Sequence, residues 1–307
     1  MKKNDKIVIF GGSGFIGRNL YLYLIREYQN VYIFDKNKPK KIKYKKKYFI
    51  HGNILNSKQI LNCLKNVDIV IHLAAHGGVL KSLKEPKENL KNNVLGTLNI
   101  LESVRINKVK KIIFASSGGT VIGDTKKKLK EDSLPNPMSH FGVSKLASEK
   151  YCNVYSNLYG FISINLRFSN VYGPFSENKS NFINNLIKSS ISDTKIIING
   201  DGTQSRDFIH VDDIVHAISK AIKFNRSNTF QIGTGVKTGL NKIIKYIIKF
   251  NSNYTKKNII NKSKIKGEVQ SVISNTSKSK NILRFKYKIK LQDGLKSTYE
   301  WFEKNEL

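Results

Sequence analysis

The stretch KIVIFGGSGFIG, residues 6–17, decides the fold. Its apolar run Ile7–Phe10 is typical of a buried strand. The segment GGSGFIG that follows spaces Gly11, Gly14 and Gly17 three residues apart, which allows a tight turn and close packing of a helix on the strand. The first N–H groups of that helix, with its positive dipole end, suit a diphosphate. We therefore expect dinucleotide binding; a plain strand–helix turn is the alternative.

The next strand-like run supports a dinucleotide. VYIFD (31–35) ends at Asp35, eighteen residues after Gly17. A carboxylate at that place accepts hydrogen bonds from the adenosine ribose hydroxyls. Its charge would repel a 2′-phosphate, so the pattern favours NAD over NADP, although Lys36 beside it offsets part of that repulsion.

Strand-like and helix-like segments alternate along the chain. Strands are expected at 6–10, 31–35, 48–50, 68–72, 111–115 and 161–167, with helices between them and after them. This alternation requires right-handed crossovers and a parallel sheet covered on both faces. We predict an α/β fold, a Rossmann-type doubly wound parallel sheet with a smaller interwoven lobe. Residues 1–168 and about 204–228 would bind NAD, and 169–203 and 229–307 would bind substrate.

The chain is strongly basic. Its 54 Lys and Arg residues against 22 Asp and Glu give a net charge of +32, which raises the hypothesis of nucleic-acid binding. Only seven of the basic residues are Arg, and the Lys excess accompanies abundant Asn and Ile along the whole chain, as A/T-rich coding produces. The densest cluster, KNKPKKIKYKKK (36–47), is interpreted as a solvated loop. We do not expect a nucleic-acid partner.

Composition also bounds the location of the protein. No stretch reaches the ~18 consecutive apolar residues of a membrane helix, and the first residues run directly into a strand, unlike a signal peptide. The only cysteines are Cys63 and Cys152, too few for a disulfide framework. We expect a cytoplasmic protein without a membrane partner and without a metal site.

Seven segments together resemble the extended short-chain dehydrogenase/reductase family, specifically its NAD-dependent nucleotide-sugar epimerases and dehydratases. They are GGSGFIG (11–17), GNI (52–54), HLAAH (72–76), NNVLGTLNIL (92–101), RFSNVYGP (167–174), GDGTQSRDFIHVDD (200–213) and DGLKSTYEWF (293–302). The resemblance runs nearly end to end. It implies that NAD is contacted by Gly11, Gly14, Phe15, Ile16, Gly17, Asp35, Asn53, Ile54, Leu73, Ala74, Ala75, Asn92, Ser116 and Lys145.

The same resemblance implies a UDP- or dTDP-hexose as substrate. The sugar or its diphosphate would be held by Ser82, Asn170 and Arg206. The planar guanidinium of Arg206 suits phosphate oxygens, and an ion pair with Asp207 or Asp212 is the alternative. Relatives often carry a further arginine in the smaller lobe, where this chain offers Lys264 or Lys266.

The stretch SHFGVSKL (139–146) departs from the family at its reactive position. Relatives have Tyr-x-x-x-Lys, whose phenolate takes the proton of a sugar hydroxyl; here Phe141 precedes Lys145. A free Tyr has a pKa near ~10, which the neighbouring Lys lowers. Phe has no proton to exchange. The relay hydroxyl of the family would be Ser117 or Thr120, and the following Val-x-Gly favours Thr120.

Three explanations of Phe141 stay open. The chain is a natural slow or silent relative, or it carries a Tyr→Phe change made to trap substrate, or Lys145 works with another hydroxyl such as that of Tyr172. The sequence favours an epimerase most like the UDP-glucose/UDP-galactose 4-epimerases. The alternatives are a silent protein that binds NAD and a nucleotide sugar, and a nucleotide-sugar dehydratase or reductase.

The helix that begins near Ser139 also predicts a homodimer. Its apolar and aromatic positions exceed what one sheet face needs, and relatives commonly pair through this helix. These positions are Leu146, Tyr151, Val154, Tyr155 and Leu158. Complete burial within one chain is the alternative.

Overall fold

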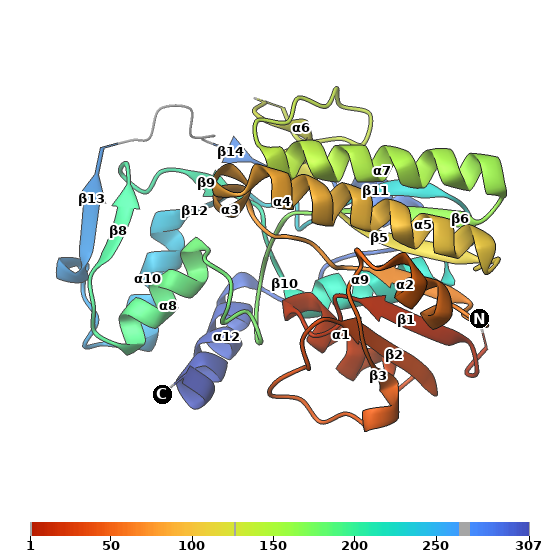
Figure 1. Cartoon of the computed structure of the whole chain (residues 1–307). Helices are drawn as coiled ribbons and strands as arrows, with labels where there is room; N and C mark the ends of the chain where they lie inside the picture. The colour runs from red at the N-terminus through yellow and green to blue at the C-terminus, as the bar shows by residue number, and fades with distance from the viewer. Residues whose placement is uncertain (1, 126, 264–270, 307) are drawn as a thin grey trace.

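The computed structural model describes residues 2–125, 127–263 and 271–306 (Figure 1). Lys264 and Lys266, the expected substitutes for a diphosphate-binding arginine, lie outside these residues. Figure 1 shows a large α/β body built on the central sheet and a smaller lobe beside it.

The central sheet confirms the predicted Rossmann-type α/β fold. Within the described residues it has seven strands, all paired in parallel, in the order β11-β6-β5-β4-β1-β2-β3. The strands are β1 (Lys6–Phe10), β2 (Asn30–Asp35), β3 (Phe49–His51), β4 (Ile69–His72), β5 (Lys111–Ser117), β6 (Ile162–Phe168) and β11 (Asn228–Ile232). The run Ile7–Phe10 is completely buried, as expected for a strand covered on both faces.

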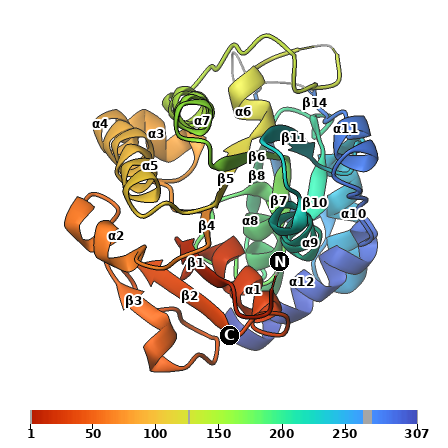
Figure 2. The same ribbon diagram turned by 90° about the vertical axis from the view of Figure 1, so that its right-hand side faces the viewer.

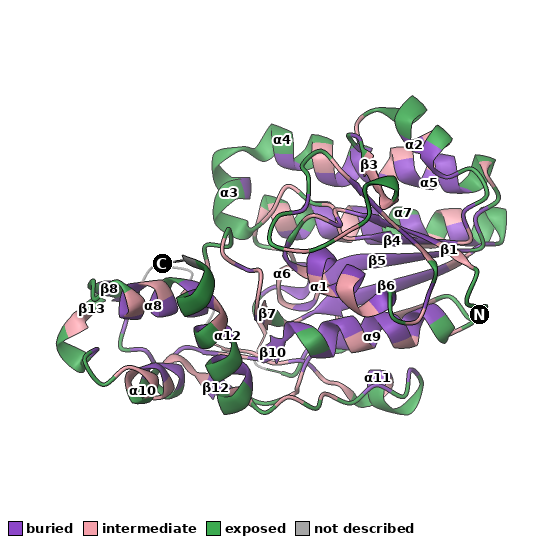
Figure 3. Cartoon of the chain, turned by 90° about the horizontal axis from the view of Figure 1, so that it is seen from below, coloured by how far each residue is buried: buried purple, intermediate pink, exposed green. Residues whose placement is uncertain are grey.

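Helices cover both faces of this sheet (Figure 2). One face carries α2 (Ser57–Cys63), α5 (Gly96–Ile106) and α7 (His140–Tyr159), and the other carries α1 (Phe15–Leu24), α9 (Val211–Lys223) and α11 (Ser277–Asn281). A short run leads into α5 through α3 (Val79–Lys84), α4 (Pro86–Leu90) and a π-helical turn, η2 (Lys91–Leu95). Figure 3 shows the strands buried and the outer faces of α4 and α5 exposed.

The smaller lobe has its own apolar core. It packs α8 (Phe182–Ile191), α10 (Leu240–Phe250) and α12 (Leu291–Glu306) beside the parallel pair β8 (Ile196–Asn199) and β13 (Ile259–Lys262). Short segments complete the chain: η1 (Lys46–Tyr48), α6 (Gly118–Ile122), β7 (Asn170–Tyr172), β9 (Ser205–Arg206), β10 (Phe208–His210), β12 (Thr238–Gly239), η3 (Lys256–Asn258) and β14 (Ser271–Val272). None of the described helices has both the length and the apolar run that a bilayer crossing needs.

One predicted lobe boundary needs correction. The assignment of 229–307 to the smaller lobe included the strand at 229–232, but β11 pairs in parallel with β6 and forms the edge of the central sheet. Phe230 and Ile232 are completely buried in the core of the large body. The chain therefore remains in the large body from α9 through β11, and it returns there at α11 (Ser277–Asn281), before α12 ends in the smaller lobe.

The Asp207 carboxylate holds together segments that run between the large body and the smaller lobe. This buried carboxylate accepts hydrogen bonds from the N–H and hydroxyl of Thr234, from the N–H of Gly235 and from the N–H of Ser274. Such buried charges are stable only when their oxygens are satisfied. Asp207 thus serves as a structural anchor where β10, β11 and β14 meet.

We predict that Gly17→Ala destabilises the fold. A Cβ at Gly17 would meet the carbonyl oxygen of Gly11 and the Cα of Gly12, both backbone atoms that cannot rotate away. Overpacking of this kind costs about 1–3 kcal/mol of unfolding free energy. Urea denaturation measures the change, with Gly239→Ala as control, because a Cβ there meets open space. Equal stability of the two variants would contradict the close packing.

Candidate active site

A cleft of about 400 Å³ opens at the carboxyl ends of the central strands. Parallel α/β sheets bind ligands at this edge. Among the residues predicted to contact a cofactor, all except Ser116 and Lys145 line this cleft. Segments separated by more than one hundred residues, from Gly11 to Ala115, therefore meet at one place.

The glycine loop shapes the floor of this cleft. Gly11 has φ +79°, and a Cβ on it would meet the backbone of Ala74, so only glycine fits there. Helix α1 begins at Phe15, and no side chain caps its first N–H groups. The unpaired N–H groups and the absence of acidic residues in the first turn make this end a site for a diphosphate.

Asp35 lies at the end of β2 on the wall of the same cleft. Its carboxylate accepts hydrogen bonds from the N–H of Ser13 (3.1 Å) and of Asn37 (3.0 Å), which hold it in place. Burial raises the pKa of the carboxyl, and these hydrogen bonds oppose that rise. Next to it, Lys36 also lines the cleft.

Lys145 and Phe141 lie one turn apart near the start of α7, as their spacing predicts. The Lys145 Nζ donates a hydrogen bond of 2.7 Å to the carbonyl of Ala115 and lies 5.7 Å from the centre of the Phe141 ring. Burial, and then the positive charge of Lys179, lower the pKa of Lys145 to about 7. The amine therefore loses its proton more easily than that of a lysine in water.

A second cavity, of about 390 Å³, lies beyond the end of β5. It brings together Ser117 and Thr120, the two candidate relay hydroxyls, with Asn170 and Arg206, two of the predicted substrate residues. The Thr120 hydroxyl is buried and has no hydrogen-bond partner among the described residues. A buried hydroxyl left unpaired by the protein suits a bound ligand.

The hydroxyls of two predicted site residues, Ser82 and Ser116, form hydrogen bonds within the protein. The completely buried Ser82 hydroxyl donates to the carbonyl of Val79 and accepts the N–H of Phe141. Likewise, Ser116 donates to Glu149, which forms a buried ion pair of 2.6 Å with Arg167. Both serines thus position the segments that carry the site.

Another hydroxyl considered for the proton transfer is that of Tyr172. It is buried between β7 and α12, with its hydroxyl 3.5 Å from the carbonyl of Leu291 and its ring against that of His210. Burial raises its pKa well above that of a free phenol. It lines neither the cleft nor the second cavity, so the geometry lends no support to a Lys145–Tyr172 relay.

Two polar residues of this region were not predicted from the sequence. Asn93 is buried, accepts the N–H of His76 and donates to the Ser144 hydroxyl, so it ties the end of β4 to α7. Its neighbour Asn92 lines the cleft instead. The other missed residue, Lys179, also lines the cleft, although it belongs to no motif.

Comparison with known proteins now decides the family. The sequence pattern of the NAD dependent epimerase/dehydratase family matches residues 7–233. The chain belongs to this family. A putative UDP-glucose 4-epimerase of Methanocaldococcus jannaschii is 35% identical over 97% of this chain and 99% of its own length.

Solved structures agree in fold. UDP-glucose 4-epimerase of Thermotoga maritima, crystallised with UDP-glucose, is 31% identical, with a TM-score of 0.92 over 98% of this chain and 100% of that one. MoeE5 with UDP-glucuronic acid and NAD is 31% identical, with a TM-score of 0.90 over 97% of this chain and 99% of that one. The same protein has been solved with UDP-glucose and NAD.

The cofactor is NAD, and the cleft fits it. The uncapped start of α1 and the close approach allowed by Gly11 suit the diphosphate, and the Asp35 carboxylate on the cleft wall suits ribose hydroxyls. The family catalyses NAD-dependent reactions of nucleotide sugars, which makes this chain a member of an enzyme family.

We predict that NAD binds more tightly than NADP and that Asp35→Ala weakens NAD binding by roughly 1.5–3 kcal/mol, the value of a charged hydrogen bond. The same substitution should reduce the ratio of NAD affinity to NADP affinity, because it removes the charge that repels the 2′-phosphate. Titration calorimetry measures both affinities. Asp132→Ala, at an exposed loop position, is the control. Equal or tighter NADP binding by the unaltered protein would sink this role of Asp35.

Proposed function

We propose that the chain is an NAD-dependent nucleotide-sugar epimerase, most like the UDP-hexose 4-epimerases. The observation that carries the proposal is the junction at the end of β5. There Ala115 lines the NAD cleft, while Ser117 lines the second cavity two residues later. A sugar in the second cavity would therefore lie beside the nicotinamide end of NAD.

The chain's own residues supply binding and proton handling. Arg206 and Asn170 would hold the diphosphate and sugar in the second cavity, and Thr120 would hydrogen-bond the reacting sugar hydroxyl. Lys145 would contact the nicotinamide ribose from its place beside Ala115. The NAD held by the cleft residues would supply reversible hydride transfer at a sugar carbon.

Phe141 limits this reaction. Its ring faces Lys145, where relatives place a phenol, yet it offers no hydroxyl to take the sugar proton. This observation favours the second candidate, a protein that binds NAD and a nucleotide sugar without turning the sugar over. The two candidates share a site and differ only in proton transfer.

We predict that Phe141→Tyr raises epimerase activity by about 10²–10⁴-fold, the usual effect of a general acid/base. The gain should appear in kcat more than in KM, because the added hydroxyl acts in the transition state. NMR of UDP- and dTDP-hexoses incubated with NAD measures epimer formation.

Adding Lys145→Met to the Phe141→Tyr protein should abolish that gain, since the phenol loses the cation that lowers its pKa. The Phe141→Tyr protein could also fold and bind NAD but turn over none of these sugars. That result would contradict the epimerase proposal and favour a protein that binds NAD and a nucleotide sugar without turnover.

We also propose that two copies pair through α5 and α7, in a cytoplasmic homodimer. These helices lie side by side (Figure 1). The outer face of α7 exposes apolar side chains. On α7, Leu158 is 68% exposed and Val154 is 50% exposed, with Tyr151 near them. The expected positions Leu146 and Tyr155 instead pack within the chain, and Tyr155 donates to Glu102.

We predict that Leu158→Glu converts the dimer into a monomer, because a two-fold interface would bring two carboxylates into an apolar contact. Light scattering at micromolar concentration measures the mass. The control is Leu134→Glu, since Leu134 is 87% exposed in a loop and should tolerate the charge. A monomeric unaltered protein would remove the dimer.

A further inference from the structure

We propose that Lys179 binds an anionic group of the nucleotide sugar, either its diphosphate or a carboxylate on the sugar. The inference rests on the proposed function and deepens it, because it assigns a residue that selects the charge of the substrate.

Lys179 lines the NAD cleft, as Lys36 and Lys81 do. Its Nζ lies 3.5 Å from the point that a Cβ on Gly77 would occupy. Among the described residues no hydrogen bond or ion pair engages this Nζ, although water reaches it. The Lys179 side chain is exposed to the cleft, and partial burial by the cleft walls lowers the pKa of its amine. A lysine that lines a cleft and has no protein partner is available to contact an anionic ligand.

The segment that carries Lys179 is held firmly on the side of the smaller lobe. The Lys179 N–H donates to the carbonyl of Ser176 (2.8 Å), and its own carbonyl accepts the Nδ2 of Asn184 on α8 (3.0 Å). Asn184 also donates to the Ser176 carbonyl (2.6 Å) and accepts the Ser176 hydroxyl (3.1 Å). The backbone at Lys179 is therefore fixed before any ligand arrives.

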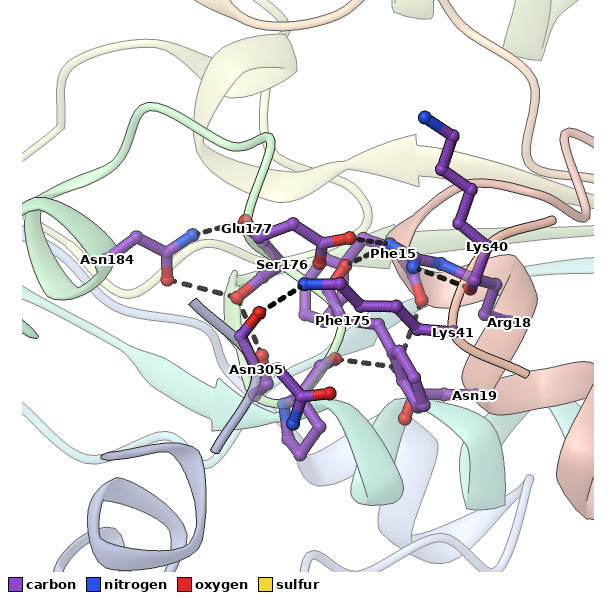
Figure 4. A network of polar contacts seen from close by, with 12 residues as sticks. Phe15, Arg18, Asn19, Lys40, Lys41, Phe175, Ser176, Glu177, Asn184 and Asn305 are labelled. Atoms are coloured by element: carbon purple, nitrogen blue, oxygen red, sulfur yellow. Dashed lines mark hydrogen bonds and ion pairs between the residues drawn. The ribbon is translucent and has the colours of Figure 1, made fainter. Parts of the chain in front are cut away.

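The same segment is tied to the cofactor helix (Figure 4). Arg18 on α1 forms a buried ion pair of 2.8 Å with Glu177 and donates to the carbonyl of Phe175. Asn19, next on α1, donates to the carbonyl of Pro174. Arg18 and Asn19 belong to the helix that follows the glycine loop. Their contacts therefore fix the position of Lys179, two residues after Glu177, relative to that loop.

The position of Lys179 favours the substrate over the diphosphate of NAD. The uncapped N–H groups at the start of α1 would serve that diphosphate. Lys179 instead stands beside Gly77, after β4, and its charge reaches Lys145 strongly enough to lower the pKa of that amine. Gly77 lines the cleft and Val79, two residues later, lines the second cavity. Lys179 beside Gly77 is therefore near the part of the cleft where a sugar and its diphosphate would enter.

The test compares Lys179→Met with the unaltered protein loaded with NAD. Calorimetry measures the affinities for UDP-glucose and UDP-glucuronate, and separately for NAD. Loss of a charged contact should weaken binding about 10- to 100-fold. If Lys179 binds the diphosphate, both sugars weaken; if it binds a carboxylate, only UDP-glucuronate does. NAD affinity should stay within about twofold, and Lys179→Arg should recover most of the binding.

Lys81→Met is the matched control, because Lys81 lines the same cleft from α3. An equal loss in Lys81→Met would mean that the general positive field binds the substrate and would overturn the assignment. Unchanged affinity of Lys179→Met for both nucleotide sugars would overturn the role of Lys179 but leave the proposed function standing. Failure of the unaltered protein to bind either sugar would overturn the proposed function and this assignment with it.

Discussion

The close packing of α1 on the loop after β1 is the contact on which both halves of the site depend. No side chain fits between Gly17 and the backbone of Gly11 and Gly12, so the helix starts directly against the strand. This places its first N–H groups at the cleft. One turn further along, Arg18 and Asn19 reach the segment after β7 and hold it in place. Helix α1 thereby fixes both the glycine loop and the segment after β7, which forms one wall of the cleft.

The end of β5 is the second point of organisation. Its residues alternate between faces, and those near its end serve three purposes. Ala115 lines the NAD cleft and accepts the Lys145 amine, Ser116 binds the Glu149 carboxylate, and Ser117 lines the second cavity. The strand therefore joins the two cavities and holds the α7 lysine through the carbonyl of Ala115. The amines of Lys145 and Lys179 near this junction suit an anionic ligand.

The parts of this arrangement that follow a period or a fixed spacing could be predicted from the sequence. The glycine spacing at 11–17 gave the loop, and the interval of four residues put Phe141 and Lys145 on one helix face. Asp35 could be placed because a strand of known direction ends at it.

Other parts depend on long-range contacts that no local pattern encodes. The pattern at 229–232 predicts a strand but does not say which sheet it joins. Adjacent asparagines in the π-helical turn face opposite ways, so that Asn92 reaches the cleft and Asn93 is buried. Lys179 lies in a loop without periodicity, and its place is set by Arg18, about 160 residues earlier in the sequence.

Tracing of deuterium at the reacting carbon tests the central claim, that this site moves a hydride within a bound nucleotide sugar. The Phe141→Tyr protein, loaded with NAD, is incubated with UDP-glucose labelled with deuterium at sugar C4, and the product is followed by NMR. We predict an inverted product that retains the label at C4, because a hydride held by bound NAD does not exchange with water. Loss of the label to water during inversion would contradict the account.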